Sequence, residues 1–305
     1  MIKNILIIIC LTIASFISCN ENDDPVESFN YLELVNKKEK INSTSRSTSN
    51  NVTWVDLDFE DVTRFSKYYP VSWSSSRYQS FVKDALGNDF LLFHHSEGKT
   101  PWLTGGEHRA GLKSLGTQIF PDIDDYKERS EIVTSLGDES YALKFGRLRY
   151  WSQSVLIQND TDSDTESFVL MQVHQSGGGK YVPFVIWMKM ENGRGLIKGS
   201  LAHPDTLASG THTLFGWTDV GPKDQWFDLA LKIAPRHEDH LGDIQVRLNG
   251  QEIGSARRYW GYPFGDDYWR LSSGIYKAPG NTNNIVICLD EIKLGSSWES
   301  IQPDN

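Results

Sequence analysis

The sequence predicts an all-β protein, a single antiparallel β-sandwich of the jelly-roll (concanavalin-like) type. Three observations support this fold class. Residues 52–300 contain many short segments rich in valine, isoleucine, leucine and aromatic residues, and these are separated by glycine, asparagine, aspartate and proline. No long segment has the apolar periodicity of an amphipathic helix. Neither a linker nor an internal repeat interrupts this region, so we expect one domain.

The first 18 residues predict a lipoprotein signal peptide. A short basic start precedes ILIIICLTIASFI, which is too short for a stable membrane anchor. The stretch FISC that follows resembles a bacterial lipobox, and Cys19 would carry the lipid. A plain signal peptide cut nearby is the alternative. We therefore expect a signal (1–18), a flexible polar tether (19–51) and a β-jelly-roll domain (52–300), with the protein on the cell surface as an outer-membrane lipoprotein or secreted.

Charge and cysteine content narrow the class of protein. The formal net charge of −10 argues against a general nucleic-acid binder, whose surface is basic. Cys10 lies in the signal and Cys19 would be lipidated, so Cys288 alone remains and no internal disulfide is expected. Cys288 lies in an apolar run and is expected to be a small buried side chain.

Ten segments are expected to be strands. In chain order they are 52–62, 128–136, 141–145, 147–157, 167–175, 181–190, 226–234, 243–253, 268–278 and 284–295. The Asn249-Gly250 pair favours a tight hairpin within the eighth segment.

The strand SFVLMQVHQ (167–175) ends in polar residues. Strict alternation divides it into two faces, with Val169, Met171 and Val173 on one and Phe168, Leu170, Gln172 and His174 on the other. If the first set faces the core, Gln172 and His174 lie on the open face, and the glycines at 177–179 allow a sharp turn beyond them. A surface strand end with two solvated side chains is the alternative.

Two further strands carry polar groups on one face. In ERSEIVTSL, Arg129 and Glu131 share a face, so the carboxylate can orient the guanidinium; a rim salt bridge of little energetic value is the alternative. In YWRLSSGIYKA, one face carries Arg270, Ser272, Gly274 and Tyr276. A glycine beside a tyrosine leaves room for a ligand, although a packing glycine beside a half-buried tyrosine is the simpler interpretation.

The order R-S-E, Q-V-H and G-I-Y resembles the active-site motifs of the jelly-roll polysaccharide lyases. Alginate lyases of this fold carry R-[ST]-E, Q-[IV]-H and Y-F-K-A-G-V-Y, and the lysine of the last motif corresponds to Ser272 here. The stretches GIYKAPG and YWGYPFGDDYW are most similar to the β-jelly-roll ulvan lyases of marine Bacteroidetes. The resemblance implies an endo-acting lyase that cleaves a uronate-containing anionic polysaccharide by β-elimination, with ulvan (at the rhamnose-3-sulfate–uronate bond) expected first. Alginate, glucuronan or heparin-type chains are alternatives, as is a non-catalytic surface glycan-binding lipoprotein.

The resemblance and the chemistry of elimination together suggest roles for the acid and the base. Tyr276 is expected to be the acid that protonates the leaving oxygen, and also the base if elimination is syn. His174 is the expected base, since its neutral form is abundant near pH 7. Lys144 and Lys180 are the alternative bases, because a desolvated lysine can lose its proton.

The substrate carboxylate must be neutralised before the C5 proton can leave, and Gln172 and Arg129 suit that role. The other expected substrate contacts are Glu131, Lys180, Arg257, Arg258, Tyr259, Tyr268, Arg270 and Ser272. Several of these lie in ARRYWGYPFGDDYWR (256–270), whose three arginines and six aromatics suit a sulfated or carboxylated sugar; a self-packed loop is the alternative.

The expected partners follow from this scheme. They are an anionic, sulfated polysaccharide and, through the lipid anchor, the outer membrane, whereas no nucleic acid is expected. We expect a monomer. Catalysis requires no cofactor in this scheme and no spacing typical of a zinc site is present, while a structural calcium ion is left open.

Overall fold

The computed structural model describes somewhat more than half of the chain. The described residues are 53–57, 64–65, 69–70, 77–83, 89–96, 102–104, 108–109, 114–119, 128–134, 143–144, 148–175, 182–202, 211–234, 241–258, 268–278 and 281–304. The predicted signal and tether lie outside these residues and stay predictions. No helix in this part of the chain is long and apolar enough to cross a membrane.

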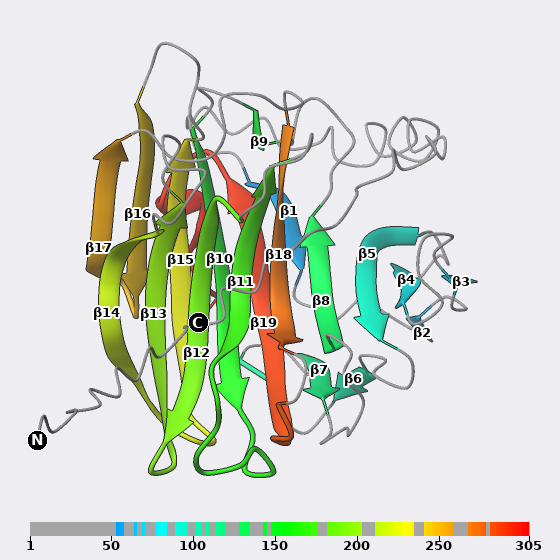
Figure 1. Ribbon diagram of the computed structural model, residues 1–305. Coiled ribbons are helices and arrows are strands. Elements are labelled where there is room, and N and C mark those ends of the chain that lie inside the picture. Colours follow the sequence, from blue (N-terminus) through cyan, green and yellow to red (C-terminus); the bar gives the residue numbers. More distant parts are fainter. Residues whose placement is uncertain are drawn as a thin grey trace, which may run out of the picture.

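The larger of two sheets has eleven strands among the described residues (Figure 1). They are β2 (Arg64–Phe65), β3 (Tyr69–Pro70), β4 (Arg77–Lys83), β5 (Asp89–Ser96), β8 (Glu128–Thr134), β9 (Leu143–Lys144), β11 (Phe168–Gln175), β12 (Phe184–Glu191), β13 (Arg194–Ala202), β14 (Thr211–Pro222) and β18 (Tyr268–Lys277). Their order is β14-β13-β12-β11-β18-β8-β5-β4-β2, with β3 beside β4 and β9 beside β18.

The smaller sheet has eight strands in the described part of the chain. They are β1 (Thr53–Leu57), β6 (Trp102–Thr104), β7 (Ser114–Ile119), β10 (Arg149–Ile157), β15 (Trp226–Ala234), β16 (Gly242–Leu248), β17 (Gln251–Arg258) and β19 (Ile285–Gly295), and a short 3-10 helix, η2 (Glu299–Ile301), follows. The order is β17-β16-β15-β10-β19-β7-β6, with β1 beside β19. All pairings described in both sheets are antiparallel, which confirms the predicted fold class.

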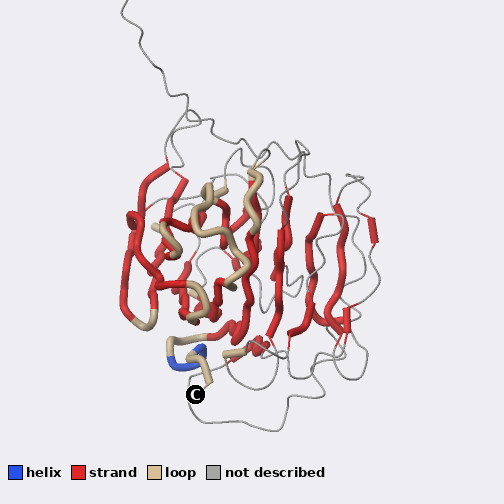
Figure 2. The backbone as a smooth tube through the Cα atoms, turned by 90° about the horizontal axis from the view of Figure 1, so that it is seen from below, coloured by secondary structure: helices blue, strands red, loops and turns tan. Residues whose placement is uncertain are grey.

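One apolar core lies between the two sheets. Figure 2 shows the backbone of the sandwich from below. Each strand contributes alternate side chains to this core, such as Leu229, Leu231 and Ile233 of β15. Cys288 of β19 is buried, as expected from its apolar run. Burial of this continuous apolar surface is the main stabilising term of the sandwich.

All ten predicted segments contain strands, and Asn249-Gly250 forms the expected turn between β16 and β17, with both residues at positive φ. The prediction missed β4, β5, β7, β13 and β14 among others. Of these, β7, β13 and β14 contain glycine, which has a low strand propensity; β14 reads THTLFGWTDVGP.

The predicted alternation of β11 is correct at one end only. Its pairing register shifts between Val169 and Met171 against both neighbours, so the strand contains an irregularity there. As a result Leu170 and Met171 are both fully buried in the core, and Val169 lies on the outer face with Tyr276 and Val185. The predicted placement of Val169 with the core, and of Phe168 and Leu170 opposite it, is therefore wrong. Gln172 lies opposite the core, as expected.

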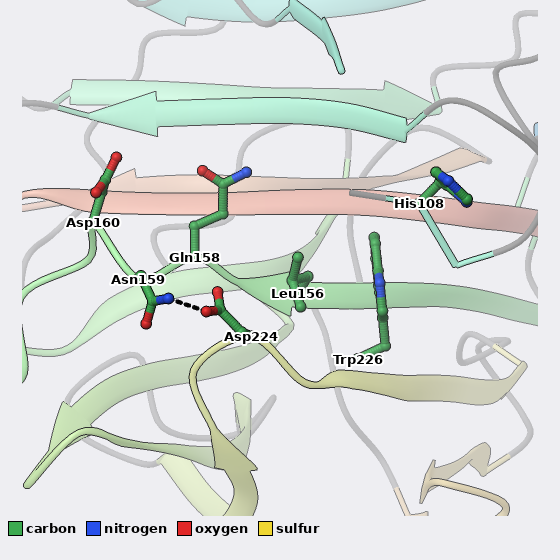
Figure 3. A pocket seen from close by; sticks show the side chains of 7 residues that line it. All are labelled: His108, Leu156, Gln158, Asn159, Asp160, Asp224 and Trp226. Carbon is green, nitrogen blue, oxygen red and sulfur yellow. Dashed lines mark hydrogen bonds between the residues drawn. The ribbon is translucent and has the colours of Figure 1, made fainter. Parts of the chain in front are cut away.

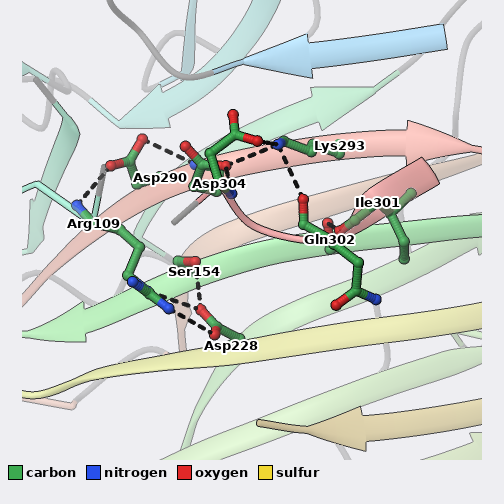
Figure 4. Close-up of polar contacts among 10 residues, drawn as sticks. Arg109, Ser154, Asp228, Asp290, Lys293, Ile301, Gln302 and Asp304 are labelled. Atoms are coloured by element: carbon green, nitrogen blue, oxygen red, sulfur yellow. Dashed lines mark hydrogen bonds and ion pairs between the residues drawn. The ribbon is translucent and has the colours of Figure 1, made fainter. Parts of the chain in front are cut away.

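The C-terminal segment is held by a buried ionic cluster on the smaller sheet (Figure 4). Lys293 Nζ lies 3.0 Å from Glu291 Oε2 and 3.0 Å from Asp304 Oδ1, and it donates to the carbonyl of Gln302. The Asp304 amide in turn donates to Glu291 at 2.9 Å. Since the side chains of Lys293 and Glu291 are only 4% and 1% exposed, removing one charge would leave the other desolvated and unpaired.

We therefore expect Lys293→Met to lower the free energy of unfolding by about 3 kcal/mol. Lys232→Met is a matched control, because Lys232 also lies 3.0 Å from a carboxylate, that of Asp243, but the pair is 25% and 35% exposed. The control should cost less than about 1 kcal/mol. Urea denaturation measures both, and equal losses in the two variants would contradict a buried charge cluster.

Candidate active site

The three polar motifs meet at the centre of the larger sheet. β18 lies between β11 and β8, and these are the strands that carry G-I-Y, Q-V-H and R-S-E (Figure 1). Tyr276 is paired with Arg129 of β8 on one side and with Val169 of β11 on the other. Residues directly opposite in an antiparallel pair share a face, so the motifs lie together on the outer face.

A hydrogen bond joins the two outer strands of this group across the middle one. Gln172 Nε2 on β11 donates to Glu131 Oε1 on β8 at 2.7 Å. The residue of β18 opposite Glu131 is Gly274, so no side chain of β18 stands between the two groups. Gly274 has φ +143°, and an added Cβ would lie 2.2 Å from the carbonyl oxygen of Ser130. Both the backbone conformation and the available space therefore require glycine.

A buried arginine completes the cluster. Arg129 Nη1 lies 3.7 Å from Glu131 Oε2, and its guanidinium carbon lies 4.6 Å from the centroid of the Tyr276 ring. Arg129, Glu131, Gln172 and Tyr276 are all buried. The buried carboxylate of Glu131 holds the Gln172 amide and the Arg129 guanidinium in fixed positions. The expected orientation of Arg129 by Glu131 is consistent with this geometry.

The cluster can bind a carboxylate from outside. The Gln172 amide has two N–H groups and uses one on Glu131, which leaves a second donor. Its Oε1 is buried and accepts no hydrogen bond from the described residues. The Arg129 guanidinium carries further N–H groups and a full positive charge. An acidic sugar placed over Gly274 would therefore meet donors on two sides.

The predicted bases lie farther along the strands. His174 shares the outer face with Gln172 and is partly exposed, but its partner on β18 is Arg270, six residues from Tyr276, or about 20 Å along the strand. Lys144 of β9 is opposite Tyr268, eight residues from Tyr276, or about 27 Å. Lys180 lies outside the described residues. The structure thus does not bring either described base next to Tyr276.

The residues predicted to contact the substrate do not all lie on the face of the cluster. Ser272 is buried and is paired with Gln172, so it belongs to the cluster's face. Tyr268 and Arg270 are placed only by the backbone of β18. Arg257 and Arg258 lie at the end of β17, the edge strand of the other sheet, and not on the face of Gln172. Tyr259 lies outside the described residues, so the expectation of one continuous arginine-rich loop is met only in part.

A pocket on the smaller sheet is separate from this cluster. It has a volume of about 410 Å³ and is lined by His108, Leu156, Gln158, Asn159, Asp160, Asp224 and Trp226 (Figure 3). Asn159 donates to Asp224 within it. Two carboxylates make it unsuitable for an acidic sugar. No group of three or more histidine, cysteine or acidic residues that could hold a metal ion occurs among the described residues.

Sequence reasoning missed an apolar part of the site. Val169, Val185 and Tyr276 form a small cluster on the outer face, separate from the main core, and Trp187 packs against it. The segment 181–190 was interpreted only as a strand. The alternation in this segment indicates the missed part of the site, because it places Val185, Trp187 and Lys189 together on the face opposite the core.

A sequence model described as polysaccharide lyase matches residues 93–293, more than half of the chain. The chain therefore belongs to the polysaccharide lyase family and is an enzyme of that class. No curated protein matches the sequence.

Solved structures of lyases are similar to this fold. The endo-β-1,4-glucuronan lyase of the fungus Trichoderma reesei has a TM-score of 0.54 at 13% identity, covering 70% of this chain and 93% of the other. The alginate lyase of Klebsiella pneumoniae has a TM-score of 0.49 at 9% identity, covering 78% and 97%. An alginate lyase of Pseudomonas aeruginosa has a TM-score of 0.42 at 15% identity, covering 60% and 83%.

We expect Gly274→Ala to disrupt both stability and the cluster, because the new methyl group meets the backbone of β8. The loss of unfolding free energy should be about 2 kcal/mol or more. Gly250→Ala is the control that separates backbone strain from steric overlap. Gly250 also has positive φ (+78°), but an added Cβ there meets nothing within 4 Å. Thermal and urea unfolding measure both variants. An equal or larger loss for Gly250→Ala would show that the contact with Ser130 is unimportant.

Proposed function

We propose that this lyase cleaves a uronate-containing polysaccharide by β-elimination at the outer face of β8, β18 and β11. The observation that carries the proposal is the buried Arg129–Glu131–Gln172 cluster next to Tyr276. Elimination needs donors for a carboxylate and a group that transfers protons at C5 and O4. The cluster offers the donors, and Tyr276 offers a phenolic hydroxyl beside them.

Charge stabilisation is the task of Arg129 and Gln172. The C5 proton of a uronate is weakly acidic, and negative charge spreads onto the carboxylate as the proton leaves. Donors that are already in place stabilise this charge without reorganising, which contributes a few kcal/mol each in known active sites. Glu131 is a positioning residue in this scheme, because it fixes the amide and the guanidinium rather than contacting the sugar.

Proton transfer is assigned to Tyr276 alone. His174 and Lys144 lie about 20 and 27 Å from it along β18, so neither reaches the same sugar carbon as the tyrosine. In this step the Tyr276 oxygen starts as the phenolate, takes the C5 proton, and as the phenol gives that proton to O4 while the C4–O4 bond breaks. A single group that does both must act from one face of the sugar. Elimination is therefore syn in this proposal, the alternative that sequence reasoning left open. The name of the similar fungal enzyme, a glucuronan lyase, agrees with a uronate substrate.

Ulvan is the finer proposal for the substrate. It is supported by the similarity of GIYKAPG to ulvan lyases and by Ser272 at the position of the alginate-lyase lysine. The argument from a paired-arginine loop is weaker than the sequence suggested, because Arg257 and Arg258 belong to β17 of the other sheet. Alginate and glucuronan remain the competing substrates.

We expect Tyr276→Phe to lower turnover by roughly a hundredfold or more while substrate binding is kept, since only the proton-transferring hydroxyl is lost. His174→Asn is the matched comparison on the same face and should retain most of the turnover. Initial rates are followed by the absorbance of the unsaturated uronate product. Equal losses in both variants would assign His174 as the base and contradict syn elimination by Tyr276.

The substrate is tested with a panel of polymers at equal uronate concentration: ulvan, desulfated ulvan, alginate, polyglucuronate and heparin. We expect unsaturated product from at least one of them, and the highest initial rate on ulvan. A higher rate on alginate or polyglucuronate would reject ulvan but keep the lyase assignment on uronates. No product from any polymer in the panel would reject β-elimination of uronates as the function.

A further inference from the structure

One row of side chains runs across the outer face of the larger sheet, at right angles to the strands. Pairing places Arg129 opposite Tyr276, Tyr276 opposite Val169, Val169 opposite Trp187, and Trp187 opposite Lys198. Because directly paired residues share a face, the row continues from the polar cluster over β11, β12 and β13. The contacts among Tyr276, Val169 and Trp187 agree with this.

Trp217 of β14 ends this row. Ile197 is paired with Thr218 and Gly199 with Phe215, so Lys198 lies beside the Gly216–Trp217 segment. Trp217 is 42% exposed, and the only other exposed large hydrophobic residues in the described part of the chain are Leu148 and Leu241. Lys189 reaches across β13, and its ammonium lies 5.0 Å from the centroid of the Trp217 ring. An exposed indole ring next to a cation offers both an apolar surface and a positive charge to an anionic sugar chain.

The local charge is positive although the protein is acidic. Lys189 pairs with Glu191 at 3.3 Å, and Arg194 pairs with Asp219 at 2.6 Å. The hydrogen bond from Arg194 holds the pKa of the Asp219 carboxyl below its usual value, so this pair stays ionised near neutral pH. Lys198 forms no ion pair with the residues that the structure describes. Its positive charge is therefore not neutralised by them, although the chain has a formal net charge of −10.

We propose that Trp187, Lys198 and Trp217 form a distal platform that binds the anionic polysaccharide several sugar rings away from the bond that is cleaved. The platform extends the proposed function, on which it rests. Trp217 lies four strand spacings from Tyr276, or about 19 Å, so one chain lying across the strands can contact both.

The residue types suit this ligand class. An indole ring offers a flat apolar surface for the C–H groups of a sugar ring, and its electron-rich face also attracts a cation such as Lys189. Lys198 has no ion-pair partner among the described residues, and it offers its ammonium to a carboxylate or a sulfate between the two tryptophans. The alternation of ring, cation and ring along one line matches a linear polymer that carries one anionic group on each ring or on alternate rings.

The platform predicts dependence on chain length. We expect Trp217→Ala and Lys198→Gln each to lower, by roughly tenfold, the ratio of kcat/KM on the best polymer of the panel to kcat/KM on its tetrasaccharide. A tetrasaccharide that is cleaved at its central bond extends only two rings from Tyr276 toward Trp217, whereas the polymer continues over the platform. Leu241→Ala is the control, since Leu241 is 44% exposed and lies beside the other sheet; its ratio should stay at the wild-type value.

A binding measurement keeps this test separate from catalysis. Full-length Tyr276→Phe protein, with and without Trp217→Ala, is run in native gels that contain alginate, polyglucuronate or ulvan, and in gels with neutral dextran. We expect an anionic polymer to retard the single variant and to retard the double variant much less. Equal retardation of both, or no retardation of the single variant by any anionic polymer, would overturn the platform. Product formation is measured separately, so failure of the lyase reaction is recognised independently.

Discussion

The hydrogen bond from Gln172 to Glu131 crosses an entire strand, and the candidate site depends on it. Side chains on β11 and β8 are two strand spacings apart and would normally be separated by a side chain of β18. Gly274 removes that obstacle, and its positive φ and the 2.2 Å between an added Cβ and the carbonyl oxygen of Ser130 exclude any larger residue. Three strands are thereby joined on their outer face by side chains as well as by their backbone ladders.

Charged groups can be buried on a face that is open to substrate because they have partners within the cluster. Arg129 and Glu131 are desolvated, which is costly for single charges, but each is next to an opposite charge and to a hydrogen-bonding neighbour. A network of this kind contributes little net stability and much positional precision. The ionic cluster of Lys293 on the other sheet follows the same logic, although it anchors the C-terminal segment instead of a substrate.

Much of the fold could be predicted because burial leaves a strong mark on the sequence. β10, β15 and β19 are rich in large apolar residues and were found, whereas β13 and β14 were missed; β13 contains glycine, and β14 contains glycine and threonine. Alternation placed Arg129 with Glu131 and Gly274 with Tyr276 on single strands, and the resemblance to the lyase motifs predicted that these residues and Gln172 lie together. The separation of His174 and Lys144 from Tyr276 could not be predicted, because it depends on which residues are paired between strands, and no single strand encodes that register. Trp217 was missed with its strand.

The irregularity in β11 has a consequence for how this sequence can vary. Leu170 and Met171 both face the core, so Val169 and Gln172 reach the outer face three residues apart instead of two. A chain shorter by one residue here would return to strict alternation and keep Gln172 on the outer face, but it would remove the register shift and move Gln172 away from its present partner on β18, Ser272. The identities of the two core residues are replaceable by other apolar side chains, but their number is not. Selection on this strand therefore acts on length at least as strictly as on composition.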